Sequence, residues 1–333
     1  MVESSSGEEA FLTADAFADN LPRQQGLEVH TISPDRLLDS SQCSVNDWVW
    51  LAQQILSHYN DFDGFVILHG TDTLAYSASA LSFMLAGLQK PLVITGAQLP
   101  LLQVGSDGRM NLEHAFLVAS GRLEKFAGVF VQFAGKLLLG CRTTKVSATK
   151  FAAFDSPNYS PIGEFGATWH VASNWRQLLP ESATSATQEP LPDFWQNEQL
   201  FTGSVGQVYL TPTISVAQIQ AISQQCDALV IQGYGTGNFP VTSAYIALYK
   251  DLVAQQKPVV IVSQCPHGSV STEAYASGKM IDSLGLIAGF DMTVEAATAK
   301  LVCALAQHTN LADLKNWLNS NQCNEINSTP RYS

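Results

Sequence analysis

The stretch that decides the fold is DGFVILHGTDTLAYSASALSFML, residues 63–85. An apolar run at 65–68 leads directly into a loop of small and polar residues, HGTDT at 69–73. Beyond this loop, apolar side chains recur on one helical face at Leu74, Ala78, Leu81, Leu85 and Leu88. A strand that leads into a helix is the building unit of a parallel sheet, so we expect an α/β fold in which Thr71 or Asp72 caps this helix.

The same unit recurs on both sides of this stretch. Strand-like apolar runs occur at 92–94, 129–133, 228–231 and 258–262, and we expect one earlier strand at 27–32. Helical faces are formed by Trp48, Leu51, Ala52, Ile55 and Tyr59, and by Val294, Ala297, Leu301 and Leu305. The alternation of strands with helices indicates a mainly parallel sheet.

A polar, Pro-bearing and aperiodic segment at about 179–202 interrupts this alternation, which resumes at Val205. We therefore expect two domains. A larger N-terminal domain at 1–180 has a mainly parallel, flavodoxin-like sheet, and a linker at 181–203 joins it to a smaller C-terminal α/β domain at 204–333.

The composition excludes several classes of protein. Of the 333 residues 46% are hydrophobic, and the net charge of -12 has the wrong sign for a surface that binds phosphates or anionic lipids. No run approaches the roughly 20 apolar residues of a membrane span, and the N-terminus lacks the pattern of a signal peptide. The six cysteines form no C-x-x-C pair, and the seven histidines form no H-x-x-x-H pair. We expect reduced thiols, a cytoplasmic location, no metal, and neither nucleic acid nor membrane as a partner.

Small and polar residues follow the buried runs in the loops HGTDT, TGAQLP, QGYGTGN and SQCPHGS. Open α/β sheets bind ligands outside the carboxyl ends of their strands, so we expect a site at this edge. The glycines at 233, 235 and 237 lack the G-x-G-x-x-G spacing, and neither a P-loop nor G-x-S-x-G occurs. A dinucleotide site, nucleotide hydrolysis and α/β-hydrolase serine chemistry are therefore disfavoured.

Thr71 and Asp72 have a simple interpretation as helix-capping residues. Their combination with Lys145, in GCRTTK at 140–145, indicates more. A threonine hydroxyl needs a base to become a nucleophile, and a lysine supplies one when it is desolvated and oriented by a carboxylate. Thr71, Asp72 and Lys145 are therefore candidates for a catalytic relay, although Lys145 alone is typical of a surface charge.

Seven segments carry a resemblance to a known family. They are DSS (39–41), residues 63–85, KPLVITGAQLP (90–100), SDGRMNLEHA (106–115), RTTK (142–145), GYGTGN (233–238) and GFDMTVEAATAKL (289–301). Over nearly its whole length the chain resembles the asparaginase/glutaminase family, and specifically its cytoplasmic type I L-asparaginases. The resemblance implies two α/β domains, an active site at their junction, and a homodimer or homotetramer in which a neighbour completes each site.

The resemblance also implies an activity, which is hydrolysis of L-asparagine to L-aspartate and ammonia through a threonine acyl-enzyme, with no metal or cofactor. L-Glutamine is the competing substrate within the family. Thr71, Asp72 and Lys145 match the Thr-Asp-Lys relay of the family, and Thr71 and Asp72 are also expected to contact the substrate.

Further positions match the substrate-binding residues of the family. Asp39, Ser40 and Ser41 match the loop that holds the α-amino and α-carboxylate groups of the substrate, although Ser40 and Ser41 fit a turn equally well. Asn238 matches an asparagine that reaches the site of a neighbouring subunit.

One motif of the family has no counterpart in these 333 residues. The family begins with a strand that ends in T-G-G-T-I-G, whose second threonine is the usual nucleophile, and MVES at 1–4 matches the residues directly after that motif. We expect that the start codon was assigned downstream or that the chain is truncated, in which case the sheet lacks an interior strand. Impaired hydrolysis is then expected, and the alternative is an inactive family member that binds a small amino acid.

Overall fold

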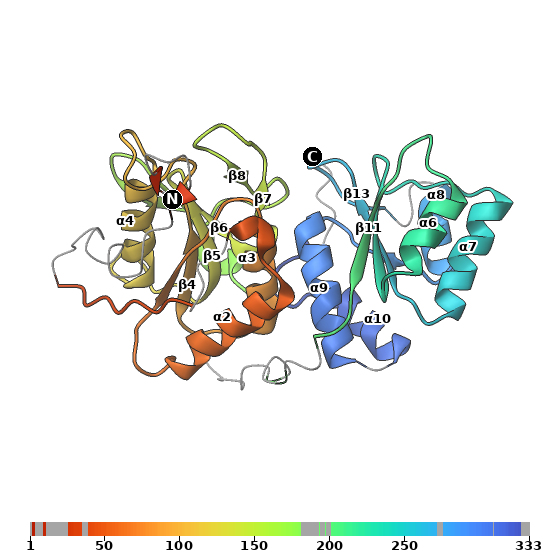
Figure 1. The fold of residues 1–333 in the computed structure, drawn as a ribbon, viewed down its shortest axis with the longest axis horizontal. Coiled ribbons are helices and arrows are strands. Elements are labelled where there is room, and N and C mark those ends of the chain that lie inside the picture. Colours follow the sequence, from red (N-terminus) through yellow and green to blue (C-terminus); the bar gives the residue numbers. More distant parts are fainter. Residues whose placement is uncertain are drawn as a thin grey trace.

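The computed structural model describes residues 2–3, 9–10, 26–34, 39–180, 193, 197, 201–271, 276–308 and 310–327. Two α/β domains lie side by side, and helices α3 (Leu74–Met84) and α9 (Val294–Gln307) face each other at their junction (Figure 1). The expectation of two α/β domains is confirmed. The expected linker at 181–203 falls almost entirely outside the described residues, so that boundary stays a prediction.

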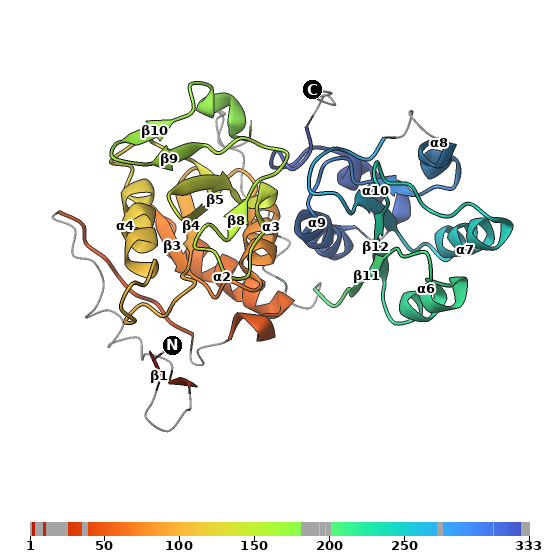
Figure 2. The same ribbon diagram turned by 90° about the horizontal axis from the view of Figure 1, so that it is seen from above.

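The N-terminal sheet joins parallel and antiparallel strands in the order β10-β9-β6-β5-β4-β3. The parallel part is β3 (Phe65–Leu68), β4 (Pro91–Thr95) and β5 (Gly128–Phe133). The antiparallel part is β6 (Lys136–Leu139), β9 (Gly163–Phe165) and β10 (Trp169–Val171). Helix α4 (Gly108–Ala119) covers one face of the sheet, while α3 and α2 (Val45–Ser57) lie on the other (Figure 2).

Helix α3 is buried on every side, because all of its residues except Tyr76 are buried. A helix without a polar face must lie between two other layers, and α3 lies between the N-terminal sheet and α9. Its small residues, such as Ala75, Ser79 and Ala80, allow the neighbouring elements to approach closely.

The C-terminal sheet is fully parallel, and its strands follow each other in sequence order. They are β11 (Val205–Tyr209), β12 (Ala228–Gly233), β13 (Val259–Ser263) and β14 (Ile287–Ala288). Helices α6 (Val216–Ser223), α7 (Ser243–Ala254) and α8 (Ala276–Ser283) lie on the outer side of the sheet (Figure 1). Helix α9 and α10 (Leu311–Asn319) lie on the side that faces the N-terminal domain.

The segment after α10 returns to the N-terminal domain. The backbone carbonyl of Cys323 accepts a hydrogen bond from Cys141 Sγ at 3.1 Å, and that of Asn324 accepts one from Arg142. Glu325 forms an ion pair of 2.5 Å with Lys300, and both side chains are fully buried. All six cysteines are free thiols.

Two local predictions are wrong. Residues 27–32 form no strand, because an apolar alternation becomes a strand only where a partner offers its backbone, and this segment is largely exposed. Helix α3 is not capped by Thr71 or Asp72, since its N-cap is Thr73. Within the described part of the chain, no helix combines the length and the apolarity needed to cross a bilayer.

The buried ion pair makes a prediction about stability. Replacement of Lys300 by Met leaves the Glu325 carboxylate unpaired inside the protein, which should lower the free energy of unfolding by about 3–5 kcal/mol. Chemical denaturation measures this change. The control is Lys136→Met, because the Lys136–Asp155 pair has side chains 36% and 43% exposed and should contribute only about 0–1 kcal/mol.

The double variant Lys300→Met, Glu325→Gln should recover part of the loss, since it removes both charges. If Lys300→Met costs no more than Lys136→Met, the buried pair does not have the assigned role.

Candidate active site

The structure brings the predicted relay residues together. Lys145 Nζ donates hydrogen bonds to Thr71 Oγ1 at 2.9 Å and to Asp72 Oδ1 at 2.8 Å. The Lys145 side chain is 22% exposed and that of Asp72 is 62% exposed, so the group opens to solvent from one side. A lysine in contact with both a hydroxyl and a carboxylate can exchange protons with either of them.

Two segments far apart in the sequence meet at this point. Thr71 and Asp72 lie in the loop between β3 and α3, and Lys145 belongs to the short strand β7 (Thr144–Lys145). Strand β7 pairs with β8 (Phe154–Asp155) in an antiparallel hairpin. The capping interpretation therefore fails for the two side chains, which turn towards Lys145.

Ser40 fixes the loop that carries Thr71 and Asp72. The Ser40 hydroxyl accepts a hydrogen bond from the Asp72 backbone N–H at 3.3 Å, and its carbonyl accepts one from Thr73 Oγ1 at 2.6 Å. Gly70 is required beside it, because a Cβ at that position would lie 2.4 Å from Ser40 Oγ. Ser40 is buried, and its hydroxyl shapes the loop in this structure.

The neighbouring residues of the predicted substrate loop remain accessible. Asp39 and Ser41 are exposed, and the Asp39 carboxylate accepts a hydrogen bond from the Ser41 backbone N–H at 3.0 Å. This bond caps the short 3-10 helix Ser40–Gln42. A carboxylate held in this way, close to the relay loop through Ser40, is available to a cationic group of a ligand.

Both ring nitrogens of His69 form hydrogen bonds, as is typical of a structural histidine. Its Nδ1 donates to the Gly70 carbonyl at 2.7 Å, which leaves Nε2 to accept from the Ser77 hydroxyl at 2.9 Å. Ser77 in turn accepts a hydrogen bond from Trp48 Nε1 at 3.0 Å. Burial lowers the pKa of His69 below its usual 6.5, so the ring is neutral at pH 7.

A second polar network holds the loop after β4. The Asp107 carboxylate accepts hydrogen bonds from the backbone N–H groups of Gln98 and Leu99, and from the side chain of Asn111. The side chain of Gln98 then donates to the carbonyls of Ala148 and Lys150, at 3.2 Å each, in the loop after Lys145.

Asp107, Asn111 and Gln98 have no role in the prediction made from the sequence. Their spacing in the sequence could have indicated a contact, because Asp107 and Asn111 are separated by i, i+4 at the start of α4 and therefore share one face of that helix.

Asn238 lies apart in the sequence, in the loop after β12 of the C-terminal domain. Its backbone N–H and carbonyl both pair with Tyr234, which folds QGYGTGN into a tight turn. A role of this residue in the site of another subunit stays a prediction.

Residues of the C-terminal domain also support the relay strand. Arg142 and Asp291 form an ion pair of 2.9 Å with side chains 1% and 6% exposed. Thr144 Oγ1 donates to Glu295 Oε1 at 2.7 Å, and burial raises the pKa of Glu295. Asp291 and Glu295 are not predicted from the sequence, because an acidic residue near a helix start has the same local pattern as an ordinary cap.

Comparison with known families agrees with this architecture. The model of the family described as Asparaginase, N-terminal matches residues 1–177, and that of the Glutaminase/Asparaginase C-terminal domain matches residues 204–318. The chain belongs to the asparaginase family. The family resemblance inferred from the sequence motifs is therefore confirmed.

Individual members of the asparaginase family match over most of their length. The chain is 36% identical to L-asparaginase 1 of Escherichia coli (strain K12) over 306 residues, which cover 92% of this chain and 86% of that protein. The structure of the thermostable L-asparaginase from Thermococcus kodakarensis has a TM-score of 0.83 at 30% identity, covering 98% of this chain and 96% of that one. L-Asparaginase I from Vibrio cholerae has a TM-score of 0.73 at 32% identity, covering 88% and 85%.

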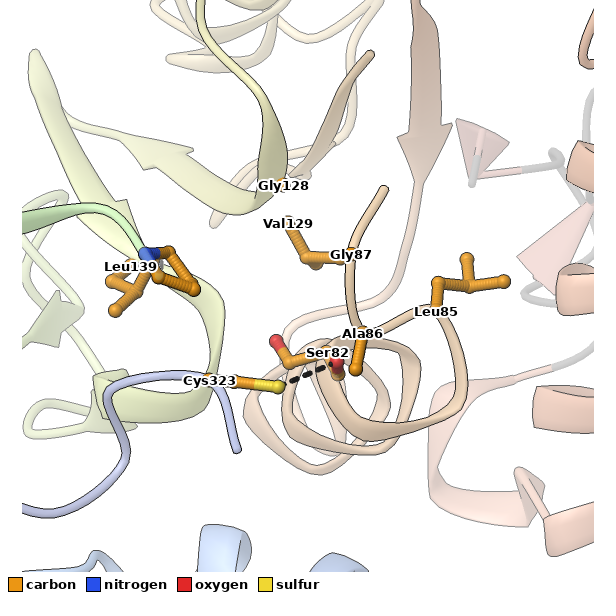
Figure 3. Close-up of a pocket in the computed structure, with 9 residues that line it drawn as sticks. Ser82, Leu85, Ala86, Gly87, Gly128, Val129, Leu139 and Cys323 are labelled. Carbon is orange, nitrogen blue, oxygen red and sulfur yellow. Dashed lines mark hydrogen bonds between the residues drawn. The ribbon is translucent and has the colours of Figure 1, made fainter. Parts of the chain in front are cut away.

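A small cavity lies away from the relay of this asparaginase-family chain. It has a volume of about 20 Å³, close to the size of one water molecule, and is lined by Ser82, Leu85, Ala86, Gly87, Gly128, Val129, Leu139, Pro180 and Cys323 (Figure 3). Cys323 Sγ donates to the Ser82 carbonyl at 2.9 Å at its edge. Because the relay precedes the first turn of α3 and the cavity adjoins the last one, about 16 Å of helix separates them.

The lowered pKa of His69 makes a prediction about pH. The unfolded chain takes up a proton at this residue near pH 6.5 and the native chain only at lower pH, so the free energy of unfolding should fall as the pH drops below 6.5. His69→Gln should flatten this fall. Chemical denaturation at pH 7 and pH 5 measures it.

Burial also lowers the pKa of His114, so this residue too should make the free energy of unfolding fall as the pH drops. The double variant His69→Gln, His114→Gln should therefore show a flatter dependence than either single variant. A His69→Gln variant with the same pH dependence as the parent contradicts the prediction.

Proposed function

We propose that this site hydrolyses L-asparagine to L-aspartate and ammonia. The observation that carries the proposal is the position of Lys145 Nζ between Thr71 Oγ1 and Asp72 Oδ1. The relatives named L-asparaginase support it, because they match this chain over most of their length.

The first step is activation of the threonine. In the ion pair Lys145 is an ammonium ion, which cannot accept the proton of Thr71. Bound substrate would exclude water from the open side, and desolvation favours the neutral form of the pair, in which Asp72 holds the proton. Lys145 then carries a free electron pair and accepts the proton of Thr71 Oγ1 as that oxygen attacks the side-chain amide carbon of the substrate.

The second step releases ammonia. The carbonyl oxygen becomes an oxyanion, which backbone N–H groups of the strand-end loops stabilise. The C–N bond breaks, Lys145 returns its proton to the leaving nitrogen, and an ester joins Thr71 to the aspartyl group. Water attacks this ester with Lys145 as the base again, which releases aspartate and restores the threonine hydroxyl.

The other ends of the substrate define further contacts. We assign the α-amino group to the exposed Asp39 carboxylate and the α-carboxylate to the hydroxyl of Ser41, beside the buried Ser40. L-Asparagine and L-glutamine share these groups and differ by one methylene, so L-glutamine is the competing substrate.

A homodimer or homotetramer is part of the proposal. Large apolar side chains are exposed around the relay, at Leu68 at the end of β3 and at Val146 and Phe151 in the loop after β7, and on the C-terminal domain at Tyr209 and Val241. A second copy that covers such residues would bury them and bring its own Asn238 to a neighbouring site. Six free thiols suit a reducing compartment, so we place the protein in the cytoplasm.

A second candidate function is binding of a small amino acid without turnover. The observation that favours it is that T-G-G-T-I-G, whose second threonine is the usual nucleophile of the family, does not occur within these 333 residues.

Calorimetry with L-aspartate, combined with an ammonia assay on L-asparagine and L-glutamine, separates the candidates. Binding without ammonia release supports the second function. Release of ammonia from either amide supports the first.

The relay makes a prediction about activity. Thr71→Val removes the attacking oxygen and should lower kcat by about 10⁶-fold, as loss of the nucleophile does in serine hydrolases. Lys145→Met removes the base and should lower kcat by about 10²–10⁴-fold. Ammonia release from L-asparagine measures both.

Lys150→Met is the matched control, because Lys150 is exposed in the same loop and its side chain is not part of the relay. Turnover by Thr71→Val at the rate of the parent chain would assign the nucleophile elsewhere.

A further inference from the structure

We propose that Glu295 of the C-terminal domain is a positioning residue that sets the direction of Lys145 through Thr144. The proposal rests on the proposed function only for its effect on catalysis. The effect on the geometry of Lys145 stands by itself.

The alternation of side chains along a strand links the direction of Lys145 to that of Thr144. Successive side chains of a strand point to opposite sides, so Thr144 and Lys145 of β7 diverge. Thr144 donates to Glu295 Oε1 at 2.7 Å on one side, while Lys145 reaches Thr71 and Asp72 on the other. A bond that holds Thr144 therefore fixes the side of the strand from which Lys145 projects.

Strand β7 is short, and its other attachments are the hairpin with β8 and the Gln98 bonds to the loop that follows. It consists of Thr144 and Lys145 alone, and most of the residues from 146 to 152 are exposed. Its pairing with β8 fixes its distance from that strand, but a pair of two-residue strands resists rotation weakly. Lys145 has a long flexible side chain, so a small rotation of the backbone moves Nζ away from Thr71.

Glu295 is suited to hold such a strand. It is 7% exposed and lies in the first turn of α9, which begins at Val294. Because α9 packs along α3, and the relay loop leads into α3, Glu295 is fixed relative to Thr71 as well as to Thr144.

A second attachment lies just upstream. Arg142 is bound to Asp291 at 2.9 Å, also from the C-terminal domain. The segment that leads into Lys145 is thus attached to the C-terminal domain at two alternate residues, Arg142 and Thr144. Docking of the C-terminal domain therefore helps to hold Lys145 in the relay.

The test measures the chemical reactivity of Lys145 in the full chain. Competitive acetylation with acetic anhydride, followed by mass spectrometry, gives the rate at Lys145 relative to the exposed Lys250 of α7. Thr144→Val and Glu295→Leu each remove one side of the hydrogen bond. Both should raise the relative rate at Lys145 by at least threefold, because the amine leaves Asp72 and Thr71.

Thr144→Ser keeps the hydroxyl and should return the rate towards that of the parent. The matched control is Thr298→Val, which is also a threonine-to-valine change. Thr298 lies on α9 one turn after Glu295, and its hydroxyl accepts a hydrogen bond from the Gln207 side chain at 3.0 Å. This variant should leave the reactivity of Lys145 unchanged.

Assays of kcat and KM on L-asparagine form a separate arm. Thr144→Val should lower kcat at least tenfold with a smaller change in KM, since the bond orients the base and does not touch the substrate. If the parent releases no ammonia, the proposed function fails while the acetylation result still decides the positioning role. The proposal is overturned if the relative acetylation rate of Lys145 is unchanged in both Thr144→Val and Glu295→Leu. It is also overturned if that rate rises equally in Thr298→Val.

Discussion

The burial of α3 constrains both domains at once. A helix whose faces are nearly all apolar or small cannot lie at the surface, so the N-terminal sheet must cover one side of it and α9 the other. The relay loop leads directly into this helix, and Glu295 lies in the first turn of the helix that covers it. The packing that joins the domains therefore also determines where the chemical groups of the site lie.

Charges placed inside this junction determine how the two layers fit. The pairs Arg142–Asp291 and Lys300–Glu325 lose their hydration on burial, and their mutual attraction offsets that cost only when the partners meet in good geometry. An apolar junction would tolerate sliding of α9 along α3, whereas a displaced ion pair would leave buried charges unpaired. The Arg142–Asp291 pair fits a role in fixing one relative position of the two domains, whereas Lys300–Glu325 attaches the C-terminal segment to α9.

Much of the fold could be predicted because its signals are local. The strands β3, β4, β12 and β13 each combine an apolar run with a polar loop, β5 is itself an apolar run, and α2, α3 and α9 each show a helical face. The segment 27–32 shows the limit of such signals, since its pattern resembles a strand but whether a partner exists depends on distant residues.

The same limit applies to the site. The relay residues stand out by type and motif, and their contacts are as predicted, although their catalytic role stays a prediction. Glu295 and Asp291 do not stand out, because what distinguishes them is a contact with Thr144 and Arg142, which lie far away in the sequence. Only the three-dimensional structure identifies such supporting residues.

The return of the C-terminal segment has a consequence for synthesis of the chain. Cys323, Glu325 and Ile326 are buried, and Cys323 lies against Cys141 and Ser82 of the N-terminal domain. Domains commonly fold one after another as they leave the ribosome. Here the first domain to emerge cannot complete its packing until residues 323–326 have been translated, so its finished form must wait for the second domain.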